Sequence, residues 1–237
     1  MKSKFTLSCM IVIILFAFSC NETPTPKSST LKKPSKNYLV KKNMEAINAS
    51  ILKITRTEYG PNGAQSWYGH CCLYANKFDK SYLALPKHCF PYKKGVRYDV
   101  ELTDFKGRKI NLESYEYFPA KNDIDAEILV VDRIDGIPNL CSRDMISPKG
   151  EVGDSAVILC PFDAREVRLK YGTISEENTI KANTLYDEHG DSGGLIVGQF
   201  GVFGILVSGL GGTTYYVPMR IFEDIYEEIV EKQSKQN

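Results

Sequence analysis

Residues 186–209 read YDEHGDSGGLIVGQFGVFGILVSG, a glycine-rich turn followed by two short apolar runs. Three glycines surround Ser192, and Asp191 precedes it. Glycine permits tight turns and a close approach of the backbone to its neighbours, so the stretch fits an ordinary loop between strands or a turn that presents a serine hydroxyl. The choice depends on whether the chain also supplies a base, an orienting acid and a site for an oxyanion.

The composition is that of a globular protein. The 237 residues are 43% hydrophobic and 25% charged, which is enough to bury a core. The formal net charge of +1 gives no electrostatic reason to expect nucleic acid or an acidic substrate. The cysteines lack the spacing of a zinc site, and there are only three histidines. We therefore expect no metal, no cofactor and no nucleic-acid partner, while the sequence leaves the oligomeric state open.

The first 20 residues have the pattern of a targeting segment. Lys2 and Lys4 precede a short apolar run that ends in Ala17-Phe18-Ser19-Cys20. This ending resembles the bacterial lipobox, whose cysteine is lipidated with acyl chains such as palmitate, although leucine is usual where Ala17 stands. Plain secretion and an uncleaved anchor are the alternatives. All three predict export, and the lipoprotein interpretation predicts anchoring through Cys20 to a membrane of the cell envelope, in the periplasm or at the cell surface.

Residues 21–42 are predicted to be a flexible tether. They are rich in proline, serine, threonine and lysine, with hardly an apolar residue before Tyr38. Such a segment cannot bury enough apolar surface to fold. The folded part is therefore expected to begin at residue 43.

Strand patterns dominate the folded part. Short apolar or alternating runs, separated by turn residues, lie at 81–88, 98–104, 126–132, 156–162, 194–209 and 213–219. Many short strands without helices between them favour barrels or a sandwich. From Met219 onward, apolar residues recur every three or four positions, and Pro218 suits a helix start. The sequence predicts an all-β protein with one C-terminal helix.

A serine hydroxyl is a poor nucleophile unless a base takes its proton. His88 is the candidate base, because it follows a predicted strand, and Asp125 is the candidate carboxylate that orients the imidazole. Asp123 is an alternative acid, but it would place both Asp125 and Glu127 inside the next strand, where carboxylates are costly to bury. We favour Asp125. The order His88, Asp125, Ser192 differs from that of subtilisin-like enzymes and α/β-hydrolases.

Several motifs in this order resemble those of chymotrypsin/trypsin-fold serine proteases. GDSGG (190–194) is similar to the nucleophile motif, and LPKHCF (85–90) to the histidine motif, with Pro86-Lys87 in place of two small residues. DAEILVVD (125–132) resembles the aspartate strand, and its pattern is closer to that of bacterial envelope proteases than to that of digestive trypsin. The second barrel of the family is matched by LKYGTIS (169–175), GVFGILVSG (201–209) and TYYVPM (214–219). The resemblance covers residues 60–235.

The resemblance implies two six-stranded antiparallel β-barrels followed by a C-terminal α-helix. The N-terminal barrel, residues 43–140, would carry the histidine and the aspartate. The C-terminal barrel, residues 141–218, would carry the serine, and residues 219–237 would form the helix and a tail.

The resemblance also implies a serine endopeptidase that acts on a protein or peptide through an acyl-enzyme. Ser192 would attack, His88 would shuttle the proton and Asp125 would hold the imidazole, with the backbone N–H groups of Gly190 and Ser192 as the oxyanion hole. In trypsin-like enzymes the residue at Asp191 receives a new N-terminal ammonium after zymogen cleavage. This chain has no Ile-Val-Gly-Gly-type start, so another donor or solvent must serve Asp191.

The family's substrate pocket maps onto residues near the serine and on the following strands. These residues are Tyr186, Asp187, Val207, Ser208, Gly209 and Thr213, with His189 at the rim. Tyr186, and Thr213 where glycine is often found, favour a small or occluded pocket, while a one-residue shift would bring Asp187 to its base. An inert protease-like binding module and a serine esterase on the same fold are the alternative functions. His70 is expected to be a strand residue of the first barrel.

The resemblance further implies a disulfide beside the histidine. In trypsin-like enzymes the cysteine after the histidine pairs with one on the preceding strand, which here is Cys71 or Cys72. Neighbouring strand residues face opposite sides, so only one of the two can point at Cys89, and we choose Cys72. Export permits such bridges, and Cys141 with Cys160 is a possible second one. Five free thiols are the alternative.

Overall fold

The structure is a computed structural model that describes residues 41–61, 63–90, 96, 98–141, 145–147, 150–163, 166–182, 191–210 and 212–235. These residues belong to one compact unit. The predicted targeting segment, its Cys20 and nearly all of the tether lie outside the described residues. Within the part of the chain that is described, no helix is long and apolar enough to cross a membrane.

A short helix, α1 (Lys41–Ala49), precedes the first strand and overlaps the last two residues of the predicted tether. Ala46 and Ile47 are buried against the main core. Ser50 follows the last helical residue: its N–H donates to the Ala46 carbonyl at 3.1 Å, and its hydroxyl satisfies the Ile47 carbonyl at 2.6 Å. These apolar residues anchor the start of the folded part.

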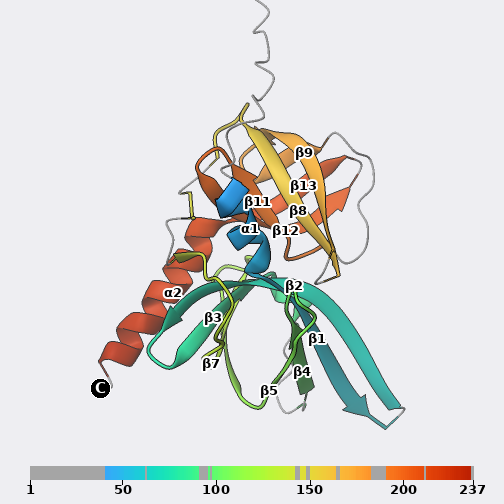
Figure 1. The fold of residues 1–237 in the computed structure, drawn as a ribbon, viewed down its shortest axis with the longest axis vertical. Coiled ribbons are helices and arrows are strands. Elements are labelled where there is room, and N and C mark those ends of the chain that lie inside the picture. Colours follow the sequence, from blue (N-terminus) through green and yellow to red (C-terminus); the bar gives the residue numbers. More distant parts are fainter. Residues whose placement is uncertain are drawn as a thin grey trace, which may run out of the picture. The chain divides into compact units, whose positions relative to one another are not determined.

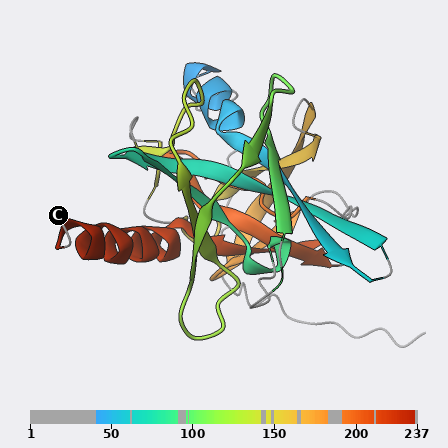
Figure 2. The same cartoon turned by 90° about the horizontal axis from the view of Figure 1, so that it is seen from below.

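The N-terminal half forms one antiparallel sheet that curls strongly (Figure 1 and, from below, Figure 2). Its strands are β1 (Ile51–Gly60), β2 (Gly63–Lys77), β3 (Lys80–Leu85), β4 (Tyr98–Thr103), β5 (Lys109–Leu112), β6 (Tyr115–Pro119) and β7 (Glu127–Asp132). They are hydrogen-bonded in the order β5-β4-β1-β2-β3-β7-β6. The edge strands β5 and β6 are consecutive in the chain, so Glu113 and Ser114 cross the opening between them.

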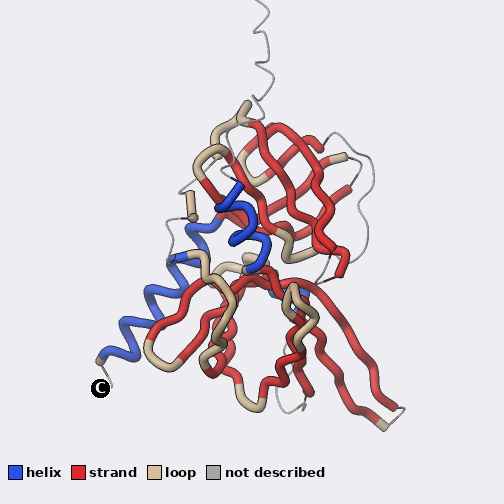
Figure 3. Tube along the Cα trace, in the orientation of Figure 1, coloured by secondary structure: helices blue, strands red, loops and turns tan. Residues whose placement is uncertain are grey.

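The C-terminal half forms a closed barrel, as Figure 3 shows in red above the curled sheet. Its strands are β8 (Ser155–Asp163), β9 (Glu166–Glu176), β10 (Thr179–Ala182), β11 (Leu195–Gly198), β12 (Gly201–Leu210) and β13 (Thr213–Pro218). They close in the order β10-β13-β12-β11-β8-β9. Its interior is filled by Ala156, Ile158, Ile174, Ile180, Ile196, Phe203, Leu206 and Tyr216.

The predicted fold class is confirmed, with two differences in detail: the helix α1, which the sequence did not predict, and the N-terminal sheet. The C-terminal barrel has the expected six strands, but the N-terminal sheet has seven and stays open, because its edge strands β5 and β6 are joined by the chain and not by a hydrogen-bonded ladder. The physical reason lies in these edge strands, which are short and only partly buried. The central strands β3 and β7 are buried along almost their whole length, because both faces of the sheet pack there.

Helix α2 (Met219–Ser234) starts directly after Pro218 and runs from the barrel along the curled sheet (Figure 1). The ring of Tyr226 stands edge-on to Tyr74 and Tyr82, with centroids 5.4 and 4.9 Å away. The Tyr82 hydroxyl donates to Oε1 of Gln233 at 2.7 Å. The helix therefore covers one face of the sheet and joins both halves in one apolar cluster.

Phe222→Ala tests this joint core. Phe222 is fully buried, so its removal should lower the free energy of unfolding by about 3–5 kcal/mol. Phe200→Ala is the matched control, because Phe200 is 74% exposed and its loss should change that energy by less than about 0.5 kcal/mol. Urea titration measures both values. Equal effects of the two substitutions would show that α2 is not part of the core.

Candidate active site

A single turn holds His88 at the end of β3. Residues Lys87–Cys89 form a 3-10 helix in which the Cys89 N–H donates to the Pro86 carbonyl at 3.0 Å and the Phe90 N–H to the Lys87 carbonyl at 3.1 Å. Cys89 and Phe90 are buried in the core of the curled sheet. Their burial fixes the turn and leaves the His88 side chain 47% exposed.

The structure brings Asp125 to His88. Oδ2 of Asp125 lies 2.6 Å from Nδ1 of His88, and Oδ1 accepts the His88 backbone N–H at 2.9 Å. The pairing of Leu85 with Glu127 explains this, since it sets the start of β7 beside the end of β3. Asp123 lies instead in an exposed turn with a φ of 55°, and no described hydrogen bond joins it to His88.

The two charges stabilise each other. The hydrogen bond to Asp125 raises the pKa of His88 to about 10, and the neighbouring Cys89 thiol adds to the rise. Burial alone would raise the pKa of Asp125, but the hydrogen bonds from the His88 ring and backbone hold it below its usual value. Hence Asp125 remains a carboxylate and fixes the proton on Nδ1, while Nε2 must lose its proton before it can act as a base.

Glu127 is the second carboxyl at this end of β7. It is fully buried, and burial raises its pKa to about 9, so it is neutral at pH 7. A charged carboxylate would be costly to bury inside this strand, and protonation of Glu127 avoids that cost. The negative charge beside His88 is therefore carried by Asp125, and Glu127 is neutral.

Ser192 lies in a tight turn, residues 191–194, that leads into β11. The Gly193 N–H donates to the Leu206 carbonyl at 2.8 Å, and the Gly194 N–H to the Asp191 carbonyl at 3.0 Å. The φ of Gly193 is +90°, and a Cβ at this position would lie 1.8 Å from the His70 carbonyl oxygen. Glycine is therefore required at 193 both for the backbone conformation and for space.

Strand β2 links this turn to the His88 turn. The His70 N–H donates to the Ser192 carbonyl at 3.1 Å. The preceding Gly69 packs so closely on Cys89 that a Cβ would lie 2.7 Å from its Sγ. A continuous path of contacts thus runs from Ser192 through β2 to the neighbour of His88. Sequence reasoning assigned no such role to Gly69 or His70, although the Gly-His-Cys-Cys run (69–72) carries the signal of a close backbone approach.

The Ser192 hydroxyl does not face His88 in this structure. Its Oγ donates to the Val207 carbonyl at 2.8 Å, and Nε2 of His88 lies 3.6 Å from Sγ of Cys89. In the described residues no hydrogen bond joins Ser192 to His88. Rotation about the Cα–Cβ bond of Ser192 exchanges the carbonyl for another acceptor, and catalytic hydrogen bonds often form only when substrate is bound.

Asp191 has a partner that the sequence left open. Its Oδ2 lies 2.6 Å from Nζ of Lys170 on β9, and the two side chains are only 12% and 13% exposed. Lysine is usually found at the surface, so nothing in the residue order marks Lys170 as the partner. Lys170 is therefore the donor that Asp191 requires.

The predicted substrate pocket is described only in part. Gly190, Tyr186, Asp187 and His189 lie outside the described residues, so the oxyanion hole is described for Ser192 alone. Val207, Ser208 and Gly209 follow one another on β12, and Thr213 begins β13. The hydrogen bond from Ser192 to Val207 places the first of them beside the serine.

The structure corrects the predicted disulfides. Cys72 and Cys89 are both free, and so are Cys71 and Cys141. Cys72 belongs to the cluster under α2, whereas Cys71 shares the interior of the curled sheet with Cys89. Neighbouring residues of β2 therefore do face opposite sides, as predicted. However, Cys71 faces the side of Cys89, and Cys72 points away from it. The second predicted bridge, from Cys141 to Cys160, is absent because Cys141 is free.

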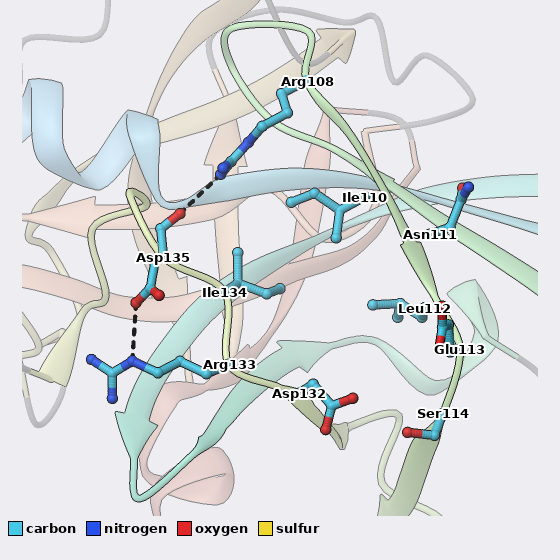
Figure 4. Close-up of a pocket in the computed structure, with 10 residues that line it drawn as sticks. All are labelled: Arg108, Ile110, Asn111, Leu112, Glu113, Ser114, Asp132, Arg133, Ile134 and Asp135. Carbon is cyan, nitrogen blue, oxygen red and sulfur yellow. Dashed lines mark hydrogen bonds and ion pairs between the residues drawn. The ribbon is translucent and has the colours of Figure 1, made fainter.

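Two cavities among the described residues are lined by none of these groups. One of about 280 Å³ sits where the chain crosses between β5 and β6; Figure 4 shows its lining, residues 108 and 110–114 on one side and 132–135 on the other. Asp132 ends β7 and Asp125 precedes it, so this cavity is at the opposite end of that strand from His88. The other, of about 380 Å³, is lined by residues of β9, β12, β13 and the start of α2. No described cluster of side chains could hold a metal ion.

Asp125→Asn should lower the pKa of His88 from about 10 toward its ordinary value of 6.5, because the substitution removes the negative charge that the protonated imidazole faces at Nδ1. Asp123→Asn, the matched control, should leave that pKa unchanged. Titration of the histidine ring signals by NMR measures both. A His88 pKa that follows Asp123 instead of Asp125 would contradict the assignment.

Comparison with known proteins gives the fold. No protein family and no curated protein matches the chain in sequence. Among solved structures, it is similar to the crystal structure of the serine endoprotease from Yersinia pestis, with a TM-score of 0.58 and 16% sequence identity over 80% of this chain. The chain spans 65% of the length of that protein. The similarity shows that the curled sheet, the closed barrel and the C-terminal helix form a protease-like, chymotrypsin-type double-barrel fold.

Proposed function

We propose that this protein is a serine endopeptidase of the chymotrypsin fold, which hydrolyses peptide bonds through an acyl-enzyme on Ser192. The observation that carries the proposal is the 2.6 Å contact of His88 with Asp125, set on the same strand framework that holds the Ser192 turn. Base and acid come from one sheet and the nucleophile from the other barrel. A nucleophile, a base and an orienting acid are the three side chains that acyl transfer to serine requires, and their origin on this framework supports the proposal.

The reaction begins when the Ser192 hydroxyl leaves the Val207 carbonyl and turns to Nε2 of a neutral His88. His88 takes the hydroxyl proton while Oγ forms a bond to the carbonyl carbon of the substrate. Asp125 stabilises the imidazolium that results, because it already accepts the Nδ1 proton. His88 then gives its proton to the leaving amine as the C–N bond breaks, and water repeats the sequence on the acyl-enzyme.

The oxyanion of each tetrahedral intermediate would bind the backbone N–H groups of Ser192 and Gly190. One such donor typically contributes 10²- to 10³-fold to the rate. Around the substrate we propose Tyr186, Asp187, His189, Val207, Ser208, Gly209 and Thr213. The sizes of Tyr186 and Thr213 favour a small or occluded pocket for the substrate side chain.

An inert, protease-like binding module is the second candidate function. One observation favours it: the Ser192 hydroxyl donates its hydrogen bond to the Val207 carbonyl and not to His88. An esterase would use the same acyl chemistry and differ only in substrate. Hydrolysis of casein and of simple esters, measured side by side, separates the three functions.

We also propose that the catalytic part is exported and tethered to the cell envelope. The support is sequence alone: two lysines, an apolar run and a lipobox-like ending at Cys20, followed by a polar tether. In this arrangement residues 21–40 would separate the lipid anchor from α1.

Ser192→Ala should reduce peptide hydrolysis by about 10⁴-fold or more, and Asp125→Asn by about 10⁴-fold, because each removes one member of the unit that moves the proton. Asp123→Asn is the matched control and should retain nearly full activity. Initial rates on casein or a peptide library, with circular dichroism as a check of folding, give the comparison.

Turnover by Ser192→Ala equal to that of the native protein would contradict the mechanism. Absence of hydrolysis by the native protein on all peptides and esters would favour the binding module.

Cys20→Ser should release the protein from the membrane fraction or leave its precursor unprocessed, because the thiol that carries the lipid is lost. Fractionation and palmitate labelling in a bacterial host measure this, with Cys9→Ser as the control that keeps the lipobox. Soluble native protein in the periplasm or medium would instead support plain secretion.

A further inference from the structure

The ion pair between Lys170 and Asp191 lies directly beside the proposed nucleophile. Asp191 precedes Ser192 in the chain, and its Oδ2 is 2.6 Å from Nζ of Lys170. Both side chains are almost nine-tenths buried. Among the described ion pairs, only this one has both side chains so deeply buried. Each of the others has at least one side chain that is 31% or more exposed.

The barrel fixes the position of the lysine. In the strand register, Lys170 on β9 pairs with Ile158 on β8, and Ile158 pairs with Ile196 on β11. The turn that holds Ser192 leads directly into β11, so Lys170 comes from the strand two positions away in the same barrel. Its ammonium is therefore supplied by rigid secondary structure.

The buried pair restricts the turn to one arrangement. A carboxylate buried without a partner is strongly unfavourable, so Asp191 cannot rotate away from Lys170 without losing the cation that compensates its charge. The Asp191 carbonyl accepts the Gly194 N–H, and the Gly193 N–H is bound by Leu206. Fixing Asp191 thus fixes the backbone on both sides of Ser192.

We propose that Lys170 is a positioning residue for the proposed hydrolysis, and this inference rests on the proposed function. Its ammonium provides, from within the barrel, the cation that orients Asp191 and thereby the backbone of the turn that carries Ser192. Because the cation belongs to a strand of the barrel, the active arrangement of the turn does not require a new N-terminus from proteolysis. The protease is active as it folds.

The test compares Lys170→Met, Lys170→Arg and Lys170→Ala with Lys121→Met. Lys121 forms an exposed 2.6 Å ion pair with Glu228 and serves as the matched control. Two readouts are used: amide hydrogen exchange of Gly193 and Gly194 by NMR, and kcat and KM for peptide hydrolysis. The exchange readout needs no activity.

In Lys170→Met we expect Gly193 and Gly194 to exchange at least tenfold faster and kcat to fall at least tenfold, with a smaller change in KM. Lys170→Arg, which keeps the charge, should retain slow exchange even if Lys170→Met does not fold. Added propylammonium should restore part of kcat in Lys170→Ala, which a loss of global stability would not permit. Lys121→Met should behave like the native protein.

Native exchange rates and native kcat in Lys170→Met would overturn the proposal. So would activity of the native protein that appears only after its N-terminal segment is cleaved. A native protein without hydrolytic activity would contradict the proposed function, while the exchange rates would still decide whether Lys170 fixes the turn.

Discussion

The contact between the Ser192 turn and the backbone of His70 is the constraint on which the site depends. The His70 N–H donates to the Ser192 carbonyl, and the His70 carbonyl occupies the space where any side chain at residue 193 would stand. This contact joins the closed barrel to the curled sheet at the point where chemistry is proposed. It sets the position of the Ser192 turn relative to the strand that packs against the neighbour of His88.

Packing on both sides of the contact between His70 and Ser192 fixes the positions of the two backbones. Strand β2 is buried on both faces around His70, with Cys71 in the interior of the curled sheet and Cys72 in the cluster under α2. Gly69 packs against Cys89 next to His88, and α2 runs from the barrel back onto the sheet. On the other side of the turn, Lys170 holds Asp191. Close packing transmits each of these positions to the two proposed catalytic side chains.

Much of this arrangement follows from local patterns in the sequence. Alternating apolar runs predict the strands, the spacing of apolar residues predicts α2, and the glycines around Ser192 predict its turn. Contacts between residues that are distant in the chain cannot be predicted from such local patterns. Alternation tells that Cys71 and Cys72 face opposite sides, but which of them faces Cys89 is set by the register of β2 with its neighbours. The open edge between β5 and β6 and the pairing of Lys170 with Asp191 likewise arise from residues distant in the chain.

The central claim is that His88 activates Ser192 in the folded protein, although the hydroxyl is bound to Val207 in this structure. Reaction of the folded protein with a fluorophosphonate, followed by mass-spectrometric mapping of the adduct, tests it most directly. The account predicts a single phosphonylated residue, Ser192, and loss of that adduct in His88→Ala and after denaturation. Failure of the folded native protein to react, or equal labelling of His88→Ala, would contradict it.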